Sequence, residues 1–377
     1  MKILQVIQYF SPKRGGTVNY VYNLVKQLLK KDHEVTIFTT DDAYDADYAD
    51  LVAPAKVIAF PSKLGFLRYS PAMKRALERE ILNYDVVHMN NYWSYQNIIA
   101  SNAAVKNNVP YILSPHGSLP IMMKGYGRKY LFEAMFGKKI IKNASQIIAV
   151  SNMESDQVKQ HNIDPNKVTV IPNAVDLDSI KFHEKGQFRR KNNISEGEKI
   201  ILFLGRIHPI KGIDLLIRAF HDLLKHVSNV KLVIVGPDEE YLDQIKEQIN
   251  ALNIKEHVIF TGPLYDEDKF SALRDSDIYV LPSWYEIFAI SVLEACACGT
   301  PVIVTKNQGV ASYIKGRAGE VIPFDHEELS KAMEKLLTNE ELRKKYGCNG
   351  EEMVKELFAW EKIIERYEQV YRKVAKK

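Results

Sequence analysis

Cysteine is scarce in this sequence, and long hydrophobic runs are absent. The three cysteines among 377 residues are Cys296, Cys298 and Cys348, and their spacing fits neither a disulfide framework nor a metal site. Thiols of this kind are typical of a reducing cytosol, where they serve as packing residues. No apolar stretch approaches the roughly 20 residues that cross a bilayer, and no small-residue cleavage site follows Met1–Ile7. A cytoplasmic protein is therefore expected.

An excess of charge is also lacking. The 51 basic and 47 acidic residues leave a formal net charge of +4, which argues against nucleic acid as the main partner. The glycine-containing loops discussed below match neither the phosphate loop Gly-x4-Gly-Lys-Ser/Thr nor the dinucleotide fingerprint Gly-x-Gly-x-x-Gly. If the chain binds a nucleotide, it must therefore use other residues.

The sequence does contain two series of short apolar runs that alternate with amphipathic helical patterns. A chain of 377 residues exceeds one ordinary core, so two domains are expected. The alternation predicts an α/β protein with two Rossmann-like doubly wound domains that face a central cleft. The predicted parts are an N-terminal domain (1–180), a linker (181–198), a C-terminal domain (199–352) and a C-terminal helix (353–377) that packs back toward the N-terminal domain.

Two glutamates stand out in the segment Ser283–Pro301. Glu286 follows an apolar run that is predicted to be a buried strand, and Glu294 lies in a small-residue helix that ends at Gly299. The carboxyl ends of strands face the crevice where open α/β sheets bind ligands. A carboxylate can accept two hydroxyl donors, so this pair suits a polyhydroxylated ligand.

Three further loops follow predicted strands. In Gly205–Gly212, Arg206 and Lys211 can clamp a diphosphate, or they are ordinary cations on a solvated turn. Gly15 and Gly16 open a helix, where they either let backbone approach an anionic ligand or form a tight turn. His116 can bind a sugar hydroxyl or phosphate or relay a proton, or it is a satisfied turn histidine.

Two Asp-x-Asp pairs could in principle hold a divalent ion. Asp266 and Asp268 begin a predicted helix, where acidic residues serve as caps and dipole partners. Asp275 and Asp277 connect a helix to a buried strand. We therefore expect no metal site.

Taken in order, these motifs resemble the retaining family 4 glycosyltransferases of GT-B fold. The resemblance covers nearly the whole chain, and its individual motifs are weak while their order and spacing are specific. It rests on the following segments: Gly15-Gly16, Pro115-His116-Gly117, Val150-Ser151, Ile171–Asp176, Gly205–Gly212, Asp277–Ser283, the Glu286/Glu294 pair, Gly299–Val302 and the helix around Trp360.

The resemblance implies a role for each matched position. Arg206 and Lys211 would neutralise the donor diphosphate, Glu294 would bind the ribose, and Glu286 would hold the transferred sugar. The amides of Phe288, Ala289 and Ile290 would contact the sugar and the distal phosphate, and Leu264 would lie near the base. In the first domain, Gly15 and Gly16 would approach the phosphates, and His116 would lie near the sugar and acceptor.

The implied activity is retaining transfer of a hexose or N-acetylhexosamine from a UDP- or GDP-sugar to a saccharide or lipid-linked acceptor. The implied pathway is cell-surface glycan or glycolipid synthesis. The nucleotide sugar is a co-substrate, and no cofactor or metal is expected, because the two cations do a metal's work. The chain departs from the family's Glu-Gly-Phe-Gly at Ile287 and Ala289, which predicts a narrower sugar pocket. Ala174 also replaces a usual glycine.

The segment 122–142 carries six cations, one acid and many bulky apolar residues. Such a basic amphipathic stretch can lie on anionic lipid, which predicts peripheral attachment to the inner face of the cell membrane. It can equally be a core helix with a solvated cationic face.

Three rival functions stay open. One is a cytosolic transferase acting on a small-molecule or sugar-phosphate acceptor. Another is an epimerase or a phosphorylase, the latter with a lysine-bound pyridoxal cofactor. The third is a non-catalytic protein that only binds nucleotide sugars.

Overall fold

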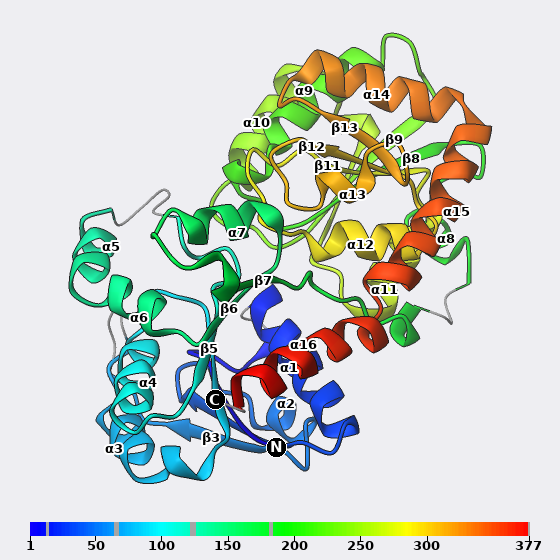
Figure 1. Ribbon diagram of the computed structural model, residues 1–377. Helices are drawn as coiled ribbons and strands as arrows, with labels where there is room; N and C mark the ends of the chain where they lie inside the picture. The colour runs from blue at the N-terminus through cyan, green and yellow to red at the C-terminus, as the bar shows by residue number, and fades with distance from the viewer. Residues whose placement is uncertain (13–14, 64–67, 121–125, 181–183, 376–377) are drawn as a thin grey trace. The chain divides into compact units, whose positions relative to one another are not determined.

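The computed structural model describes residues 1–12, 15–63, 68–120, 126–180 and 184–375 (Figure 1). The chain divides into two compact units. Unit 1 contains Met1–Ala174 and Trp360–Lys377, and unit 2 contains the continuous segment Val175–Ala359. Each unit is built around one parallel β-sheet, which confirms the predicted α/β class.

The sheet of unit 1 has seven parallel strands in the order β3-β2-β1-β4-β5-β6-β7. The chain starts at the centre with β1, where Ile3 pairs with Val35 on one side and Val86 on the other. Such an order is that of a doubly wound sheet. The strands are β1 (Lys2–Val6), β2 (Glu34–Thr40), β3 (Lys56–Phe60), β4 (Val86–Asn90), β5 (Tyr111–Ser114), β6 (Gln146–Ala149) and β7 (Val168–Val170).

Helices cover both faces of this sheet. Because side chains alternate along a strand, Ile3 enters the core on one face and Leu4 the core on the other. The Ile3 face is covered by α1 (Gly16–Lys30), α2 (Ala46–Asp50) and α16 (Trp360–Ala375). The opposite face is covered by α3 (Pro71–Glu80), α4 (Tyr95–Lys106), α5 (Tyr126–Phe132), α6 (Lys138–Asn143) and α7 (Asn152–Lys159).

Unit 2 has a six-stranded parallel sheet in the order β10-β9-β8-β11-β12-β13. Its strands are β8 (Lys199–Leu204), β9 (Val230–Val235), β10 (Val258–Gly262), β11 (Ile278–Leu281), β12 (Val302–Thr305) and β13 (Gly319–Ile322). Its helices are α8 (Gln187–Lys191), α9 (Ile213–Leu223), α10 (Leu242–Ala251), α11 (Asp266–Asp275), α12 (Ile290–Ala297), α13 (Ala311–Ile314), α14 (His326–Thr338) and α15 (Glu340–Leu357). Helix α9 packs against α10 and α14, and α12 packs against α11 and α15.

The predicted linker 181–198 is corrected by the structure. Its described part belongs to unit 2, which begins at Val175. Helix α8 packs on α11, and the side chain of Asp275 accepts hydrogen bonds from the amides of Gly186 and Arg189. The polar composition that predicted a linker therefore reflects a short helix fixed by charge-assisted hydrogen bonds.

The single C-terminal helix predicted over 353–377 is also corrected. Helix α15 ends at Leu357, and α16 begins at Trp360. At the break, the amide of Val175 donates to the carbonyl of Phe358 at 2.9 Å. Helix α16 then packs beside α1 in unit 1 and buries one apolar side, including Trp360 and Tyr367 (Figure 1).

Candidate active site

Two loops meet at the carboxyl end of the unit 2 sheet. They follow β8 and β11, which are neighbours at the point where the strand order reverses. Open parallel sheets bind ligands at this switch point. The amide of Trp284 in the second loop donates to the carbonyl of Ile210 in the first at 2.9 Å, so the two loops are joined by backbone.

Close approach of these loops depends on Gly212. Its φ of +68° lies in the left-handed region, and a Cβ there would stand 2.2 Å from the carbonyl oxygen of Pro282. Any other residue would push the two loops apart. Gly212 is also the N-cap of α9, so the same residue ends the Lys211 loop and starts a helix.

Lys211 and Glu286 form a direct ion pair between the two loops. Lys211 Nζ contacts Glu286 Oε2, and the side chains are only 14% and 20% exposed. The backbone of Glu286 is fixed as well, because its amide donates to Asn307 and its carbonyl accepts from Gly309. The structure thus brings together two residues that the sequence places 75 positions apart.

Arg206 lies after β8 but binds a different carboxylate. Its Nη1 donates to Glu239 Oε1 at 2.7 Å and Oε2 at 2.6 Å, and the side chains are 54% and 37% exposed. Sequence reasoning missed Glu239. The available signal was its place just after β9, which is the strand beside β8.

Glu294 also has a partner that the sequence did not reveal. Lys269 on α11 donates to Glu294 Oε1 on α12 at 2.7 Å, with both side chains about one-fifth exposed or less. Lys269 Nζ also lies 4.3 Å from the ring centroid of Phe270. Nothing in the spacing of these residues points to the pair, because it depends on how α11 packs on α12.

The segment from Ile287 to Ala289 has ordinary backbone φ angles, although Ile287 and Ala289 stand where the family commonly has glycine. None of these residues is among the non-glycine residues with positive φ, and all three are buried. The Phe288 ring packs against Phe358 and Tyr313 at centroid distances of 6.0 and 6.4 Å. Ala289 caps α12 without a side-chain hydrogen bond, so the first amides of this helix are the groups available to an anion.

Two other residues of unit 2 concern the carboxyl end of its sheet. Leu264 is half-buried two positions after β10, the strand at the sheet's edge. Sequence reasoning also missed Tyr279, whose hydroxyl donates to the Leu204 carbonyl at 3.0 Å and lies 2.8 Å from Ser291 Oγ. Burial raises the pKa of Tyr279, which keeps this phenol neutral.

In unit 1, the predicted glycine loop follows β1. Gly15 has φ +93° and is the N-cap of α1, and Gly16 is the first residue of that helix. A Cβ at either position would meet no atom within 4 Å. These glycines therefore border open space, and no side-chain hydrogen bond caps the helix.

His116 follows β5 in the same unit. It has a left-handed φ of +51°, and its Nε2 lies 3.1 Å from Asn90 Oδ1. The ring packs edge-on against Tyr20 at 5.6 Å between centroids. Burial lowers the pKa of His116 to about 4, so the imidazole is neutral at physiological pH.

Glu154 holds the backbone of the His116 loop and was not predicted. Its Oε1 accepts from the amide of Gly117 at 2.5 Å, and its Oε2 accepts from the amide of Val150 at 2.8 Å. Burial raises the pKa of the Glu154 carboxyl to about 7, although both amides favour the anion. The sequence Ser151-x-x-Glu154 matches the capping-box motif and could have revealed it, although the carboxylate accepts from the Val150 amide and not from that of Ser151.

The two Asp-x-Asp pairs are occupied by protein groups. Asp268 binds Lys191 at 2.9 Å, and Asp277 binds Lys199 and Arg189 at 3.1 Å. In the described part of the chain, no cluster of three histidine, cysteine or acidic side chains could hold a metal ion.

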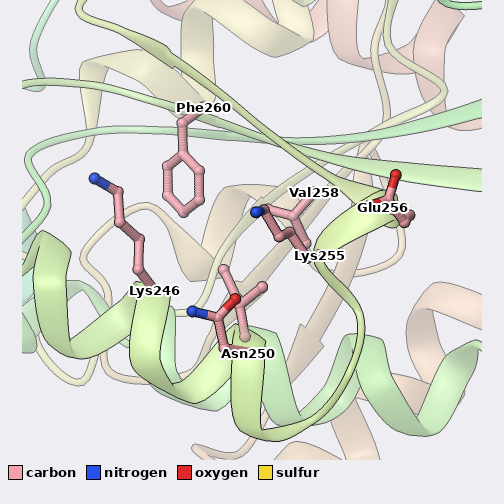
Figure 2. A pocket seen from close by; sticks show the side chains of 7 residues that line it. Lys246, Asn250, Lys255, Glu256, Val258 and Phe260 are labelled. Atoms are coloured by element: carbon pink, nitrogen blue, oxygen red, sulfur yellow. The ribbon is translucent and has the colours of Figure 1, made fainter.

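A surface cavity of about 540 Å³ lies elsewhere, between α10 and the edge strand β10 (Figure 2). It contains none of the predicted site residues. Its lining is Lys246, Ile249, Asn250, Lys255, Glu256, Val258 and Phe260.

The described part of the predicted membrane segment, 126–142, forms α5, a π-helical turn over Glu133–Gly137 and most of α6. Residues 122–125 lie outside the described residues. Phe132, Ile140 and Ile141 are core residues. We call its exposed cationic and large apolar side chains the basic-apolar patch; they are Arg128, Tyr130, Leu131, Met135, Lys138, Lys139 and Lys142. In the ranges that the structure describes, no helix has the length and apolar character to cross a membrane.

The chain folds into two units, each built around one parallel sheet, and charged loops lie at the switch point of unit 2. This is an α/β architecture of the GT-B type, and solved structures share it. The chain matches Anabaena HepE in complex with UDP and glucose with a TM-score of 0.82 and 20% identity, over 99% of this chain and 100% of that one.

Family models identify the chain more closely. Residues 14–179 match the model for Glycosyltransferase Family 4, and residues 184–353 match that for glycosyl transferases group 1. The protein belongs to this family and is a glycosyltransferase. An uncharacterised glycosyltransferase of Methanocaldococcus jannaschii is 28% identical over 99% of this chain and 98% of its own. The phosphatidyl-myo-inositol mannosyltransferase of Mycobacterium leprae is 26% identical over 100% of this chain and 97% of its own.

Proposed function

We propose that the protein transfers a hexose or N-acetylhexosamine from a nucleotide-diphosphate sugar with retention of configuration. The observation that carries this proposal is the pairing of Lys211 with Glu286 at the switch point of unit 2. A cation and a carboxylate there offer one group for a phosphate oxygen and another for sugar hydroxyls. The name of the HepE complex, which contains UDP and glucose, supports a UDP-sugar as donor.

The charges of unit 2 suit the departure of a nucleotide diphosphate. Lys211 and Arg206 would stabilise the negative charge that grows on the leaving phosphate, and the uncapped start of α12 would add backbone donors. Glu294 would accept from the ribose hydroxyls. We propose that no metal is required, because two cations already supply this charge. The departing phosphate would help to take the acceptor proton, so that no side-chain nucleophile is needed.

A donor screen tests this proposal. UDP- and GDP-sugars are added separately, and the thermal midpoint of unfolding is measured; stabilisation by one base only would identify the nucleotide. Glu294→Ala should abolish that stabilisation and the transfer reaction. Glu320→Ala is a matched control, because Glu320 is also a partly buried glutamate of unit 2 paired with a lysine, Lys335 at 2.6 Å. Transfer that survives Glu294→Ala would refute the donor site.

We further propose a lipid-linked or saccharide acceptor and peripheral attachment to an anionic membrane. The basic-apolar patch supports attachment, because Tyr130, Leu131 and Met135 are 62%, 60% and 52% exposed beside several cations. Exposed apolar groups among cations suit a surface of anionic lipid. The name of the Mycobacterium leprae relative indicates that its acceptor is a lipid.

Flotation with phosphatidylglycerol vesicles tests the attachment. The wild-type protein should float at low salt, and Lys138→Glu, Lys139→Glu and Lys142→Glu together should abolish flotation. The control carries three charge reversals at exposed positions of α3, namely Lys74→Glu, Arg75→Glu and Arg79→Glu. No binding of the wild-type protein at low salt would favour a cytosolic enzyme with a small-molecule or sugar-phosphate acceptor.

A further inference from the structure

A chain of buried hydrogen bonds lies beneath His116 in unit 1. Its members are Gln5 on β1, His88 and Asn90 on β4, Ser114 on β5 and Tyr371 on α16, and each is at most 1% exposed. The distances are 2.9 Å from Asn90 Nδ2 to Gln5 Oε1, 3.2 Å from Gln5 Nε2 to the Tyr371 hydroxyl, and 2.7 Å from that hydroxyl to His88 Nδ1. His88 Nε2 lies 2.7 Å from Ser114 Oγ.

The orientation of the Asn90 amide is fixed by what surrounds it. Its Nδ2 faces Gln5 Oε1 and also the backbone carbonyl of Val6 at 3.4 Å. A backbone carbonyl can only accept, so the nitrogen of the amide must be on this side. The other hydrogen bonds of the series are consistent with this orientation, because Gln5 Nε2 then donates to the Tyr371 hydroxyl and that hydroxyl donates to His88 Nδ1. Every hydrogen bond of this buried series then has one donor and one acceptor.

Asn90 therefore presents only its carbonyl oxygen to His116. An acceptor at 3.1 Å from Nε2 requires that this nitrogen carries the proton. Because the ring is neutral, Nδ1 is left with a lone pair. Among the residues that the structure describes, none provides a hydrogen-bond partner for Nδ1. The ring itself is held by Tyr20 and its backbone by the bond from Gly117 to Glu154.

We propose that Asn90 is a positioning residue that holds His116 in the Nε2–H tautomer, so that Nδ1 accepts a hydrogen bond from a substrate hydroxyl. The proposal rests on the glycosyl-transfer function proposed above, in which the substrates that His116 would contact are rich in hydroxyl groups. It adds a direction to that contact: the substrate donates and the histidine accepts. In the other tautomer the lone pair of Nε2 would face the carbonyl oxygen of Asn90, and Nδ1–H would donate to the oxygen of a substrate hydroxyl.

Nitrogen-15 NMR of histidine-labelled protein tests the tautomer directly. The ring signals of His116 are assigned by their loss in His116→Gln. We expect a protonated Nε2 and an unprotonated Nδ1 in the wild-type protein at neutral pH. A protonated Nδ1, or an even mixture of the two tautomers, would overturn the proposal. This measurement needs no variant of Asn90, so it stands even if such variants fold poorly.

Asn90→Ala then tests whether Asn90 is what holds His116 in this tautomer. We expect a mixture of His116 tautomers and about a tenfold lower kcat/KM for UDP-glucose turnover, measured as UDP release, which matches the loss of one hydrogen bond. Gln146→Ala is the matched control, because Gln146 is also a buried amide of this sheet, and its bonds run to Thr169, Asn166 and Lys373 instead. It should leave the tautomer unchanged and the rate within about twofold.

The two proposals fail in different ways. If Asn90→Ala lowers the thermal midpoint but leaves the His116 signals as in the wild type, Asn90 is merely structural and the positioning proposal is wrong. If no sugar nucleotide is turned over while the Nε2–H tautomer is observed and depends on Asn90, the proposed function fails and the tautomer assignment stands.

Discussion

The two units arrange their candidate site residues by opposite means. Unit 2 uses charge, because Arg206, Lys211 and Glu294 each contact an ion of opposite sign. Unit 1 uses neutral groups, because His116 and the buried chain beneath it are linked by hydrogen bonds between uncharged side chains. We expect that the partly exposed ion pairs of unit 2 exchange for a charged ligand, whereas the buried neutral network of unit 1 fixes a geometry.

The largest expected effect is that of removing Lys211, the half-buried cation of unit 2. Lys211→Ala leaves Glu286 without its partner and removes a charge proposed to stabilise the leaving phosphate. We expect kcat to fall by about 10²–10³-fold, as for loss of one preorganised donor in a transition state. Steady-state kinetics with the identified donor would measure this.

Lys225→Ala provides the control, because this lysine forms an exposed pair with Asp222 in the same unit. It should change kcat by less than about twofold. Equal losses in both variants would show that the Lys211 position has no special role.

Substitution of the glycine that brings the loops together tests geometry rather than charge. Gly212→Ala places a Cβ against the Pro282 carbonyl, and we expect the free energy of unfolding to fall by about 2–4 kcal/mol. Gly316→Ala is matched in backbone, because Gly316 also has φ +68° but would meet no atom within 4 Å. The difference between the two in chemical denaturation isolates the close approach, and equal losses would contradict it.

Acid should act on unit 1 through its buried histidines. Burial lowers the pKa of His88 to about 3, while in the unfolded chain it is about 6.5. The unfolded state therefore binds a proton that the folded state does not, so stability is full above pH 6.5 and declines toward pH 3. The expected slope is about 1.4 kcal/mol per pH unit for this residue.

Thermal unfolding at a series of pH values would measure that decline. His88→Gln removes the titrating group, and its stability should depend less steeply on pH in the same range. Because the pKa values of His33 and His116 are also lowered by burial, some pH dependence should persist. An unchanged slope in His88→Gln would contradict the assignment.

The smallest effect concerns the exposed pair of unit 2. Glu239→Gln should release Arg206 for a diphosphate and tighten UDP binding by up to about fivefold, because such pairs contribute about 0–1 kcal/mol. Calorimetric titration with UDP would measure it, and Glu256→Gln offers an exposed control. Weaker binding in Glu239→Gln would mean that Glu239 assists the ligand.

The strands and the site loops could be predicted because buried parallel strands form short apolar runs with functional residues at their carboxyl ends. The run Ile278–Leu281, for example, predicts both the strand and the place of Glu286. The break between α15 and α16 could not be predicted, since Phe358 and Ala359 are both buried and continue the apolar pattern.

The ion-pair partners illustrate a second limit. Glu239 lies 33 residues from Arg206, and Lys269 lies 25 residues from Glu294. Which of many surface charges meet depends on strand order and helix packing, and neither leaves a local signal in the sequence. The Asn90–His116 bond is hidden for the same reason.

The break at Phe358 marks a place where the gene could be cut to separate unit 2 from unit 1. Val175 and Ala359, the first and last residues of unit 2, are joined by an isolated parallel β-bridge. Unit 2 is thus an insertion whose two ends meet, as in domains that can be transplanted or circularly permuted. A gene fragment for 175–359 encodes a complete sheet with all its strands, and a few residues would suffice to rejoin the flanking chain.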